Sequence, residues 1–303
     1  MVASRYLTLA VAALAGTAFA VPVDVEKRAI DTTVFDRLKF FSQYAAASYC
    51  KGNNNSTNTK ITCPAGNCPD VQAANTHTVS EFENSILTDV TGFVAYDTTN
   101  QLIVVSFRGS SSIRNWLTDL NFPVVVSDIC KNCSVSTGFW TSWSEARKNV
   151  LAAVDIARAL YPTYKIVVTG HSLGGALADL AAGTLRANGL NVDLYTYGAP
   201  KVGLAGISNF LSDASKGASY RVTHLNDPVP RLPPALLGYR HVSPEYYIAT
   251  GNDVLPSAND VTKYEGINNQ LGNEKDTEFD TSAHTWYFGP ISSCGEGGFE
   301  FKA

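Results

Sequence analysis

The chain has 303 residues, of which 45% are hydrophobic and 17% are charged, and its formal net charge at pH 7 is −4. A mildly acidic sequence without a cluster of lysines and arginines argues against nucleic acid or an anionic membrane surface as the main partner. The length is sufficient for one large domain with a well-buried core, and no repeat or Pro/Ser-rich linker divides the sequence.

The N-terminus has the features of a secretory leader. A positive charge, an apolar stretch and a small-x-small cleavage site follow one another within residues 1–20, which predicts a signal peptide. Residues 21–28 end in the dibasic pair Lys27-Arg28, as a propeptide would. We therefore expect a secreted protein whose mature domain covers residues 29–303. No later stretch is long and apolar enough to suggest a membrane-spanning helix.

All six cysteines follow the leader, and an even number in a secreted chain predicts three disulfide bonds. The short spacings favour three pairs, which are Cys63–Cys68, Cys130–Cys133 and, from the two that remain, Cys50–Cys294. A redox role for the Cys130-x-x-Cys133 pair is the alternative, but no thioredoxin-like βαβ pattern surrounds it. Glycosylation sequons occur at Asn54, Asn55 and Asn132, of which Asn132 is the least favourable because it lies between two cysteines.

Helical and strand patterns alternate along the chain. The expected elements, in order, are a helix over 33–49, a hairpin of strands 92–96 and 102–107, a helix over 143–160, a strand over 165–169, a helix after residue 172, and strands over 192–197 and 220–225. This order predicts an α/β sheet with parallel central strands and helices on both faces. Ligands of such sheets bind beyond the carboxyl ends of the strands.

Residues 113–120 form a short amphipathic segment. Its apolar residues fall at helical spacing and its polar residues lie opposite them; the two sets are Ile113, Trp116, Leu117 and Leu120, and Arg114, Asn115, Thr118 and Asp119. Eight residues are too few to form a stable isolated helix, so the apolar stripe must pack against something. It is either a permanently packed helix or a lid, which would cover a binding site in water and open onto lipid.

The most informative motif is Gly170-His171-Ser172-Leu173-Gly174, which separates a β-branched strand from an Ala/Leu-rich helix. A G-x-S-x-G sequence between a strand and a helix is typical of a nucleophile elbow, in which the serine lies on a sharp, exposed turn. Glycine is needed on both sides because the turn leaves no room for a Cβ atom. We predict Ser172 as a nucleophile; a plain strand–turn–helix corner is the alternative.

A serine nucleophile needs a base and an acid, expected in the chain order serine, acid, histidine. Asp227 lies just after the strand over 220–225, although Asn-Asp-Pro is also an ordinary turn sequence. His241 and His284 follow it, and His284 is favoured because it precedes an aromatic run near the C-terminus. His171 is expected to be a structural residue of the turn.

An oxyanion hole needs two converging donors. The residue after the nucleophile, Leu173, provides one backbone N–H by position. Ser110 ends the strand over 102–107 in Phe107-Arg108-Gly109-Ser110 and is the candidate for the second donor, with an ordinary Gly-Ser turn as the alternative.

Taken together, these motifs resemble the lipase class 3 family, and in particular the extracellular triacylglycerol lipases of filamentous fungi, over essentially the whole chain after the leader. The resemblance rests on seven stretches, which are 106–110, 114–116, 169–177, 197–203, 226–234, 243–246 and 283–288. It implies a single α/β-hydrolase-like domain in which helices flank a central, mostly parallel sheet, with a helical lid.

By the same resemblance, Ser172, Asp227 and His284 match the family's catalytic triad, Ser110 and Leu173 its oxyanion donors, and residues 113–120 its lid. The six cysteines match its three-bridge pattern. The expected activity is hydrolysis of triacylglycerols at a lipid–water interface through an acyl-enzyme, with no metal, no cofactor and no obligate protein partner. Mono- and diacylglycerol lipase, phospholipase A1-type and feruloyl esterase activities remain open. An inactive lipase-fold binding protein is the non-enzymatic alternative, but it should lack a triad residue and none is missing.

Overall fold

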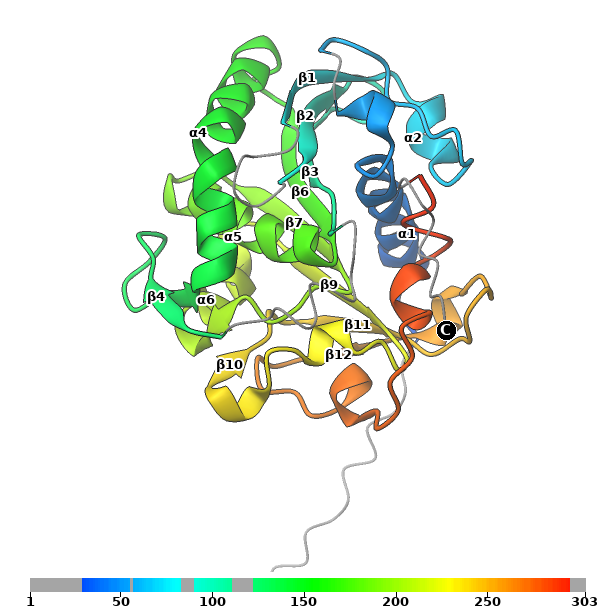
Figure 1. Ribbon diagram of the computed structural model, residues 1–303. Helices are drawn as coiled ribbons and strands as arrows, with labels where there is room; N and C mark the ends of the chain where they lie inside the picture. The colour runs from blue at the N-terminus through cyan, green and yellow to red at the C-terminus, as the bar shows by residue number, and fades with distance from the viewer. Residues whose placement is uncertain (1–28, 55–56, 83–89, 111–121, 295–303) are drawn as a thin grey trace, which may run out of the picture.

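The computed structural model describes residues 29–54, 57–82, 90–110 and 122–294 (Figure 1). The predicted leader and the predicted lid therefore lie outside the described residues. The main sheet has eight strands, which in spatial order are β1 (Thr76–Phe82), β2 (Gly92–Asp97), β3 (Leu102–Phe107), β6 (Lys165–His171), β7 (Val192–Tyr197), β9 (Ser219–His224), β11 (Glu245–Ile248) and β12 (Val261–Tyr264). The five strands from β3 to β11 are parallel, and β1, β2 and β12 run antiparallel to their neighbours.

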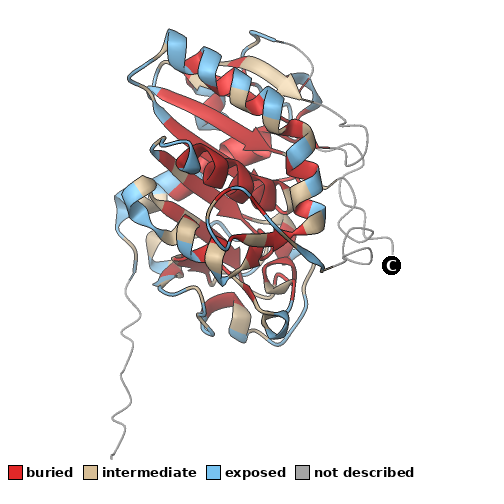
Figure 2. Ribbon diagram, turned by 90° about the vertical axis from the view of Figure 1, so that its left-hand side faces the viewer, coloured by how far each residue is buried: buried red, intermediate tan, exposed pale blue. Residues whose placement is uncertain are grey.

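Helices cover both faces of this sheet (Figure 1). The α-helices of the described residues are α1 (Thr32–Ala47), α2 (Pro69–Ala73), α4 (Thr137–Leu160), α5 (Leu173–Ala187) and α6 (Ala205–Ser212). Alternate residues of each central strand pack into two hydrophobic clusters, so that in β3 Ile103 joins the cluster under α4 and α5 while Val104 joins the cluster under α1. Figure 2 shows these buried strands between helices whose outer surfaces are exposed. None of the helices in the described part of the chain could cross a membrane.

A smaller sheet and several 3₁₀ turns complete the fold. A second sheet contains, in spatial order, β10 (Tyr239–Arg240), β8 (Gly203–Leu204), β5 (Ser134–Ser136) and β4 (Val124–Val126). The 3₁₀ turns are η1 (Lys51–Asn53), η2 (Ala214–Lys216), η3 (Val229–Arg231), η4 (Ala235–Leu237), η5 (Ala258–Asp260), η6 (Gly272–Lys275) and η7 (Ala283–Thr285). Two of them, η3 and η7, bring residues to the candidate site.

The predicted α/β architecture is confirmed, and most predicted elements agree with the structure to within two residues. One helix differs more: α4 begins at Thr137, six residues before the predicted start at Trp143. Its first turn contains Thr137 and Gly138, which are weak helix formers, although the buried Phe139 already lies on the same helix face as Trp143. Strands β1, β11 and β12 and the second sheet were not predicted.

Three disulfide bonds are present, Cys50–Cys294, Cys63–Cys68 and Cys130–Cys133, and none of the cysteines is free. The asparagines of the glycosylation sequons differ in their exposure to solvent. Asn54 is 3% exposed and its Nδ2 donates to the Ser48 carbonyl at 2.8 Å, whereas Asn132 is exposed. Burial therefore disfavours Asn54, and the position of Asn132 between two bridged cysteines does not bury it. Asn55 lies outside the described residues.

Candidate active site

Ser172 lies at the turn between β6 and α5 with φ 59° and ψ −130°. Such a conformation is strained for a residue with a side chain, and strain of this kind concentrates at functional sites. The flanking glycines permit it: a Cβ on Gly170 would lie 2.1 Å from the Gly174 carbonyl oxygen, and one on Gly174 would lie 2.3 Å from that of Phe107. The tight turn that the sequence predicts is present.

Asp227 and His284 form a buried pair at the carboxyl edge of the sheet. His284 Nδ1 lies 2.8 Å from Asp227 Oδ2 and 3.0 Å from Oδ1, and both side chains are 0% exposed. The Val229 N–H donates to Oδ1 at 2.9 Å, and the Tyr287 hydroxyl donates to Oδ2 at 2.5 Å. A carboxylate only accepts, so His284 Nδ1 carries a proton and donates it. In the neutral ring, Nε2 is then the acceptor.

Two buried atoms at this site have no hydrogen-bond partner among the described residues. They are Ser172 Oγ and His284 Nε2. Unpartnered buried polar atoms are rare in folded proteins, and a catalytic role is one explanation for them.

Strand β7 connects the serine to the His–Asp pair. The Ser172 N–H donates to the Tyr197 carbonyl at 2.9 Å, and a Cβ on the next residue, Gly198, would lie 3.0 Å from both the His284 ring and Asp227 Oδ2. The nucleophile turn and the pair are therefore adjacent at the end of one strand.

The two candidate oxyanion donors belong to different segments, each of which adjoins the serine. Leu173 is the first residue of α5, and the first N–H groups of a helix have no acceptor within the helix. Ser110 follows β3, and a Cβ on its neighbour Gly109 would lie 2.9 Å from Ser172 Cβ. The loop that carries Ser110 therefore packs directly on the nucleophile.

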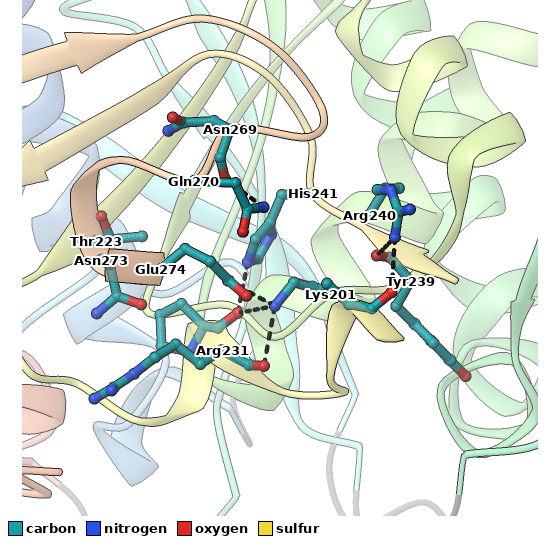
Figure 3. A network of polar contacts seen from close by, with 12 residues as sticks. Lys201, Thr223, Arg231, Tyr239, Arg240, His241, Asn269, Gln270, Asn273 and Glu274 are labelled. Atoms are coloured by element: carbon teal, nitrogen blue, oxygen red, sulfur yellow. Dashed lines mark hydrogen bonds and ion pairs between the residues drawn. The ribbon is translucent and has the colours of Figure 1, made fainter. Parts of the chain in front are cut away.

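His241, the alternative base, occupies a different place. Its Nε2 donates to the Pro230 carbonyl at 2.5 Å, in a network with Lys201 that Figure 3 shows. Burial, together with the nearby charges of Arg221 and Lys201, keeps the pKa of His241 well below its usual value. A neutral histidine committed to a carbonyl is a structural residue, so the geometry favours His284.

The same network holds the loop that carries Asp227. Lys201 Nζ donates to the carbonyls of Pro230 and Arg231 at 3.2 and 3.0 Å and pairs with Glu274 Oε2 at 2.9 Å (Figure 3). Asn273 Nδ2 donates to the Asp227 carbonyl at 3.0 Å. The same Nδ2 also donates to the Leu225 carbonyl, so buried donors fix the backbone on both sides of the acid.

Tyr287 was missed at the sequence level. Its hydroxyl donates to Asp227 Oδ2, which also accepts from His284. Tyr287 and Asp227 are 60 positions apart in the sequence. The aromatic run after His284 reads as core, and no local pattern indicates that one hydroxyl reaches a carboxylate. Burial, and then the charge of Asp227, raises the pKa of Tyr287 well above its usual value, so this hydroxyl stays protonated as a donor.

Comparison with known proteins agrees with this geometry. Residues 104–237 match the lipase (class 3) family, and residues 7–79 match the lipase 3 N-terminal region. Over 298 residues, which are 97% of either chain, the sequence is 37% identical to the secreted mono- and diacylglycerol lipase A of Penicillium cyclopium. The chain belongs to the class 3 lipase family.

Other relatives support the same conclusion for this lipase. It is 42% identical to the secreted mono- and diacylglycerol lipase 1 of Fusarium solani, over 89% of this chain and 81% of that protein. The crystal structure of the mono- and diacylglycerol lipase of Aspergillus oryzae superposes with a TM-score of 0.83 at 42% identity, over 87% of this chain and all of that one. The α/β-hydrolase-type fold is thereby confirmed, and so is the prediction that the lipase is secreted.

Proposed function

We propose that this lipase hydrolyses acylglycerols at a lipid–water interface, with Ser172 as nucleophile, His284 as general base and Asp227 as the acid that orients it. One observation supports this most strongly. The Nδ1–H of His284 is committed to Asp227, which leaves a buried, unpartnered Nε2 at the same end of β7 as a strained and equally unpartnered serine hydroxyl. Serine hydrolases need such an acceptor within reach of the nucleophile.

The chemistry follows from these positions. Ser172 Oγ attacks the ester carbonyl while His284 Nε2 takes its proton, and the negative charge of the tetrahedral intermediate develops near the N–H of Leu173 and the loop of Ser110. The imidazolium, stabilised by Asp227, returns the proton to the departing glyceride oxygen, and the acyl group stays on Ser172. Water, deprotonated by His284, then attacks the acyl-enzyme and releases the fatty acid.

Mono- and diacylglycerols are the substrates that we propose. The relatives from Penicillium and Fusarium are both named as mono- and diacylglycerol lipases, and these names fit partial glycerides better than the triacylglycerols expected from the sequence. Triacylglycerol lipase activity is the second candidate, and phospholipase A1-type and feruloyl esterase activities are weaker ones. The lid at residues 113–120 lies outside the described residues, so its role stays a prediction from the sequence.

A substrate panel tests the proposal. We expect purified enzyme to release fatty acid faster from emulsified mono- and diacylglycerol than from triacylglycerol, phosphatidylcholine or methyl ferulate, and Ser172→Ala to abolish release from all of them. Retention of activity in Ser172→Ala would exclude the proposed nucleophile. A higher rate on triacylglycerol would exclude the proposed preference, and no release from any glyceride would support a binding protein.

A further inference from the structure

Tyr49 lies just after α1 and its hydroxyl reaches the candidate site. The residue is 4% exposed, and its hydroxyl oxygen lies 2.6 Å from His171 Nδ1 and packs against Gly109. The approach is so close that a Cβ on Gly109 would lie 2.1 Å from the Tyr49 oxygen. Glycine at position 109 is thus required for this contact.

His171 continues the contact to the proposed base. Its Nε2 lies 2.8 Å from the backbone carbonyl of His284, and its ring is fully buried. A carbonyl only accepts, so Nε2 carries the proton of the neutral ring, and Nδ1 then accepts from the Tyr49 hydroxyl. Burial and the neighbouring His284 keep the pKa of His171 well below its usual value, which is consistent with a neutral ring.

The resulting hydrogen bonds all run in one direction. The Tyr49 hydroxyl donates to His171, and the His171 Nε2–H donates to the His284 carbonyl, while Gly109 packs against the Tyr49 oxygen. We refer to these four residues as the Tyr49 chain.

The position of the Tyr49 chain in the sequence is informative. Gly109 immediately precedes the candidate oxyanion residue Ser110, and His171 immediately precedes Ser172. The last member is the backbone of His284 itself. The Tyr49 chain therefore contacts the backbone next to Ser110, next to Ser172 and at His284. These three groups come from separate segments of the protein and must converge on one ester carbon.

We infer that Tyr49 and His171 are positioning residues, which hold the oxyanion loop, the nucleophile turn and His284 in register for the reaction. The inference rests on the proposed function. The rate of such a reaction depends steeply on the alignment of the reacting groups, so a displacement of about 1 Å can cost about 100-fold. A hydrogen bond that only stabilised the fold would change the melting temperature without this effect on turnover.

Tyr49→Phe tests the inference, with Tyr44→Phe as a matched control. Tyr44 is a residue of α1 and is 0% exposed. Its hydroxyl donates to Asp97 Oδ2 at 2.8 Å, away from the candidate site. Both variants lose one buried hydroxyl. We expect similar losses in melting temperature, but a kcat on soluble p-nitrophenyl butyrate that falls about 10- to 100-fold in Tyr49→Phe alone, with KM within about twofold of the wild-type value.

Variants at His171 provide a second readout. Gln places an N–H donor near the position of Nε2, so His171→Gln should retain a much larger share of kcat than His171→Leu, which has no donor. Because Tyr49 acts through His171, the kcat losses of Tyr49→Phe and His171→Leu should not multiply in the double variant.

Each outcome is decisive. A kcat of Tyr49→Phe within twofold of that of Tyr44→Phe, at equal stability, would overturn the inference, and so would equal kcat values for the Gln and Leu variants. Activity that survives Ser172→Ala would instead overturn the proposed function. If His171→Leu does not fold, Tyr49→Phe still distinguishes the two roles.

Discussion

Tyr287 and His284 donate to the same carboxylate oxygen, Asp227 Oδ2, at 2.5 and 2.8 Å. All three side chains are buried, so no water can replace a lost donor without a rearrangement. Tyr287→Phe removes one of the two. Since hydrogen bonds to charged groups contribute about 1.5–3 kcal/mol, we expect kcat/KM to fall about tenfold or more. Steady-state kinetics on a soluble ester measure this, with Tyr44→Phe as the control; equal losses in both variants would contradict the prediction.

Gly198 leaves little room for a side chain next to His284 and Asp227. An added Cβ would lie 3.0 Å from each of them, at a residue with φ +55°. We expect Gly198→Ala to lower kcat/KM by about 100-fold, because the pair must move. Gly189→Ala is the control, since Gly189 also has a positive φ of +84° but no atom within 4 Å of the added Cβ. It should cost about 1 kcal/mol of stability and leave activity unchanged. If Gly198→Ala and Gly189→Ala lost similar activity, backbone strain and not displacement of the His–Asp pair would explain the loss.

Lys201 is a buried cation that connects three segments. Lys201→Met leaves Glu274 and the carbonyls of Pro230 and Arg231 without their donor. Breaking a buried pair from one side typically costs about 3–5 kcal/mol in the free energy of unfolding. Lys263→Met is the comparison, because the Lys263–Glu265 pair is 43% and 68% exposed and should contribute at most about 1 kcal/mol. Urea denaturation measures both, and equal shifts would show that the buried network contributes little.

Asp179 of α5 is a buried carboxyl group whose Oδ1 has no hydrogen-bond partner. Burial raises its pKa to about 8, although Arg221 and Arg186 oppose the shift. The folded state therefore keeps a proton that the unfolded chain releases near its ordinary value of 3.8. Between these values the folded state binds more protons, so this carboxyl lowers the free energy of unfolding progressively as the pH rises from about 4 to about 8.

Asp179→Asn removes that titration. We expect the variant to match the wild type at pH 5 to within about 1 kcal/mol, and to be more stable by about 1–4 kcal/mol at pH 9. Melting curves of the two proteins at several pH values measure the difference. A variant that is less stable at pH 9 would show that an ionised Asp179 pairs favourably with the two arginines.

The start of the mature domain is also testable. We propose that residues 1–20 and 21–28 are removed in turn and that the catalytic domain covers residues 29–303. Ala29 is exposed and forms a β-bridge with Thr262, so a new N-terminus fits at this position. N-terminal sequencing of the secreted protein should begin at Ala29, and a sequence that begins at Val21 would show that the dibasic pair is not cleaved.

The sequence predicted the central sheet because its strands carry their own signal. Lys165–His171 and Val192–Tyr197 are dense in β-branched and aromatic residues and are bounded by turns, so their identity is local information. Strands β11 and β12 were missed because Tyr246 and Tyr247 of β11 and Thr262 of β12 lie in short stretches whose strand state depends on neighbours that are distant in sequence.

The candidate site shows the same division. Ser172 is marked by its own turn, and the Asp227 loop is marked by its place after a strand. Tyr49 and Tyr287 act through hydroxyl contacts that span 122 and 60 residues, to His171 and Asp227 respectively. A buried tyrosine that packs and one that also donates look alike in a single sequence, so only the folded chain separates them.

The bond between Cys50 and Cys294 joins residues 244 positions apart. Extracellular proteases cut exposed loops first, and nearly every exposed loop of this domain lies between those two cysteines. A single cut in such a loop leaves both pieces covalently attached, with the segment that bears His284 still fastened beside the end of α1. In a medium rich in other secreted hydrolases, a nicked molecule would keep its parts together and could continue to function.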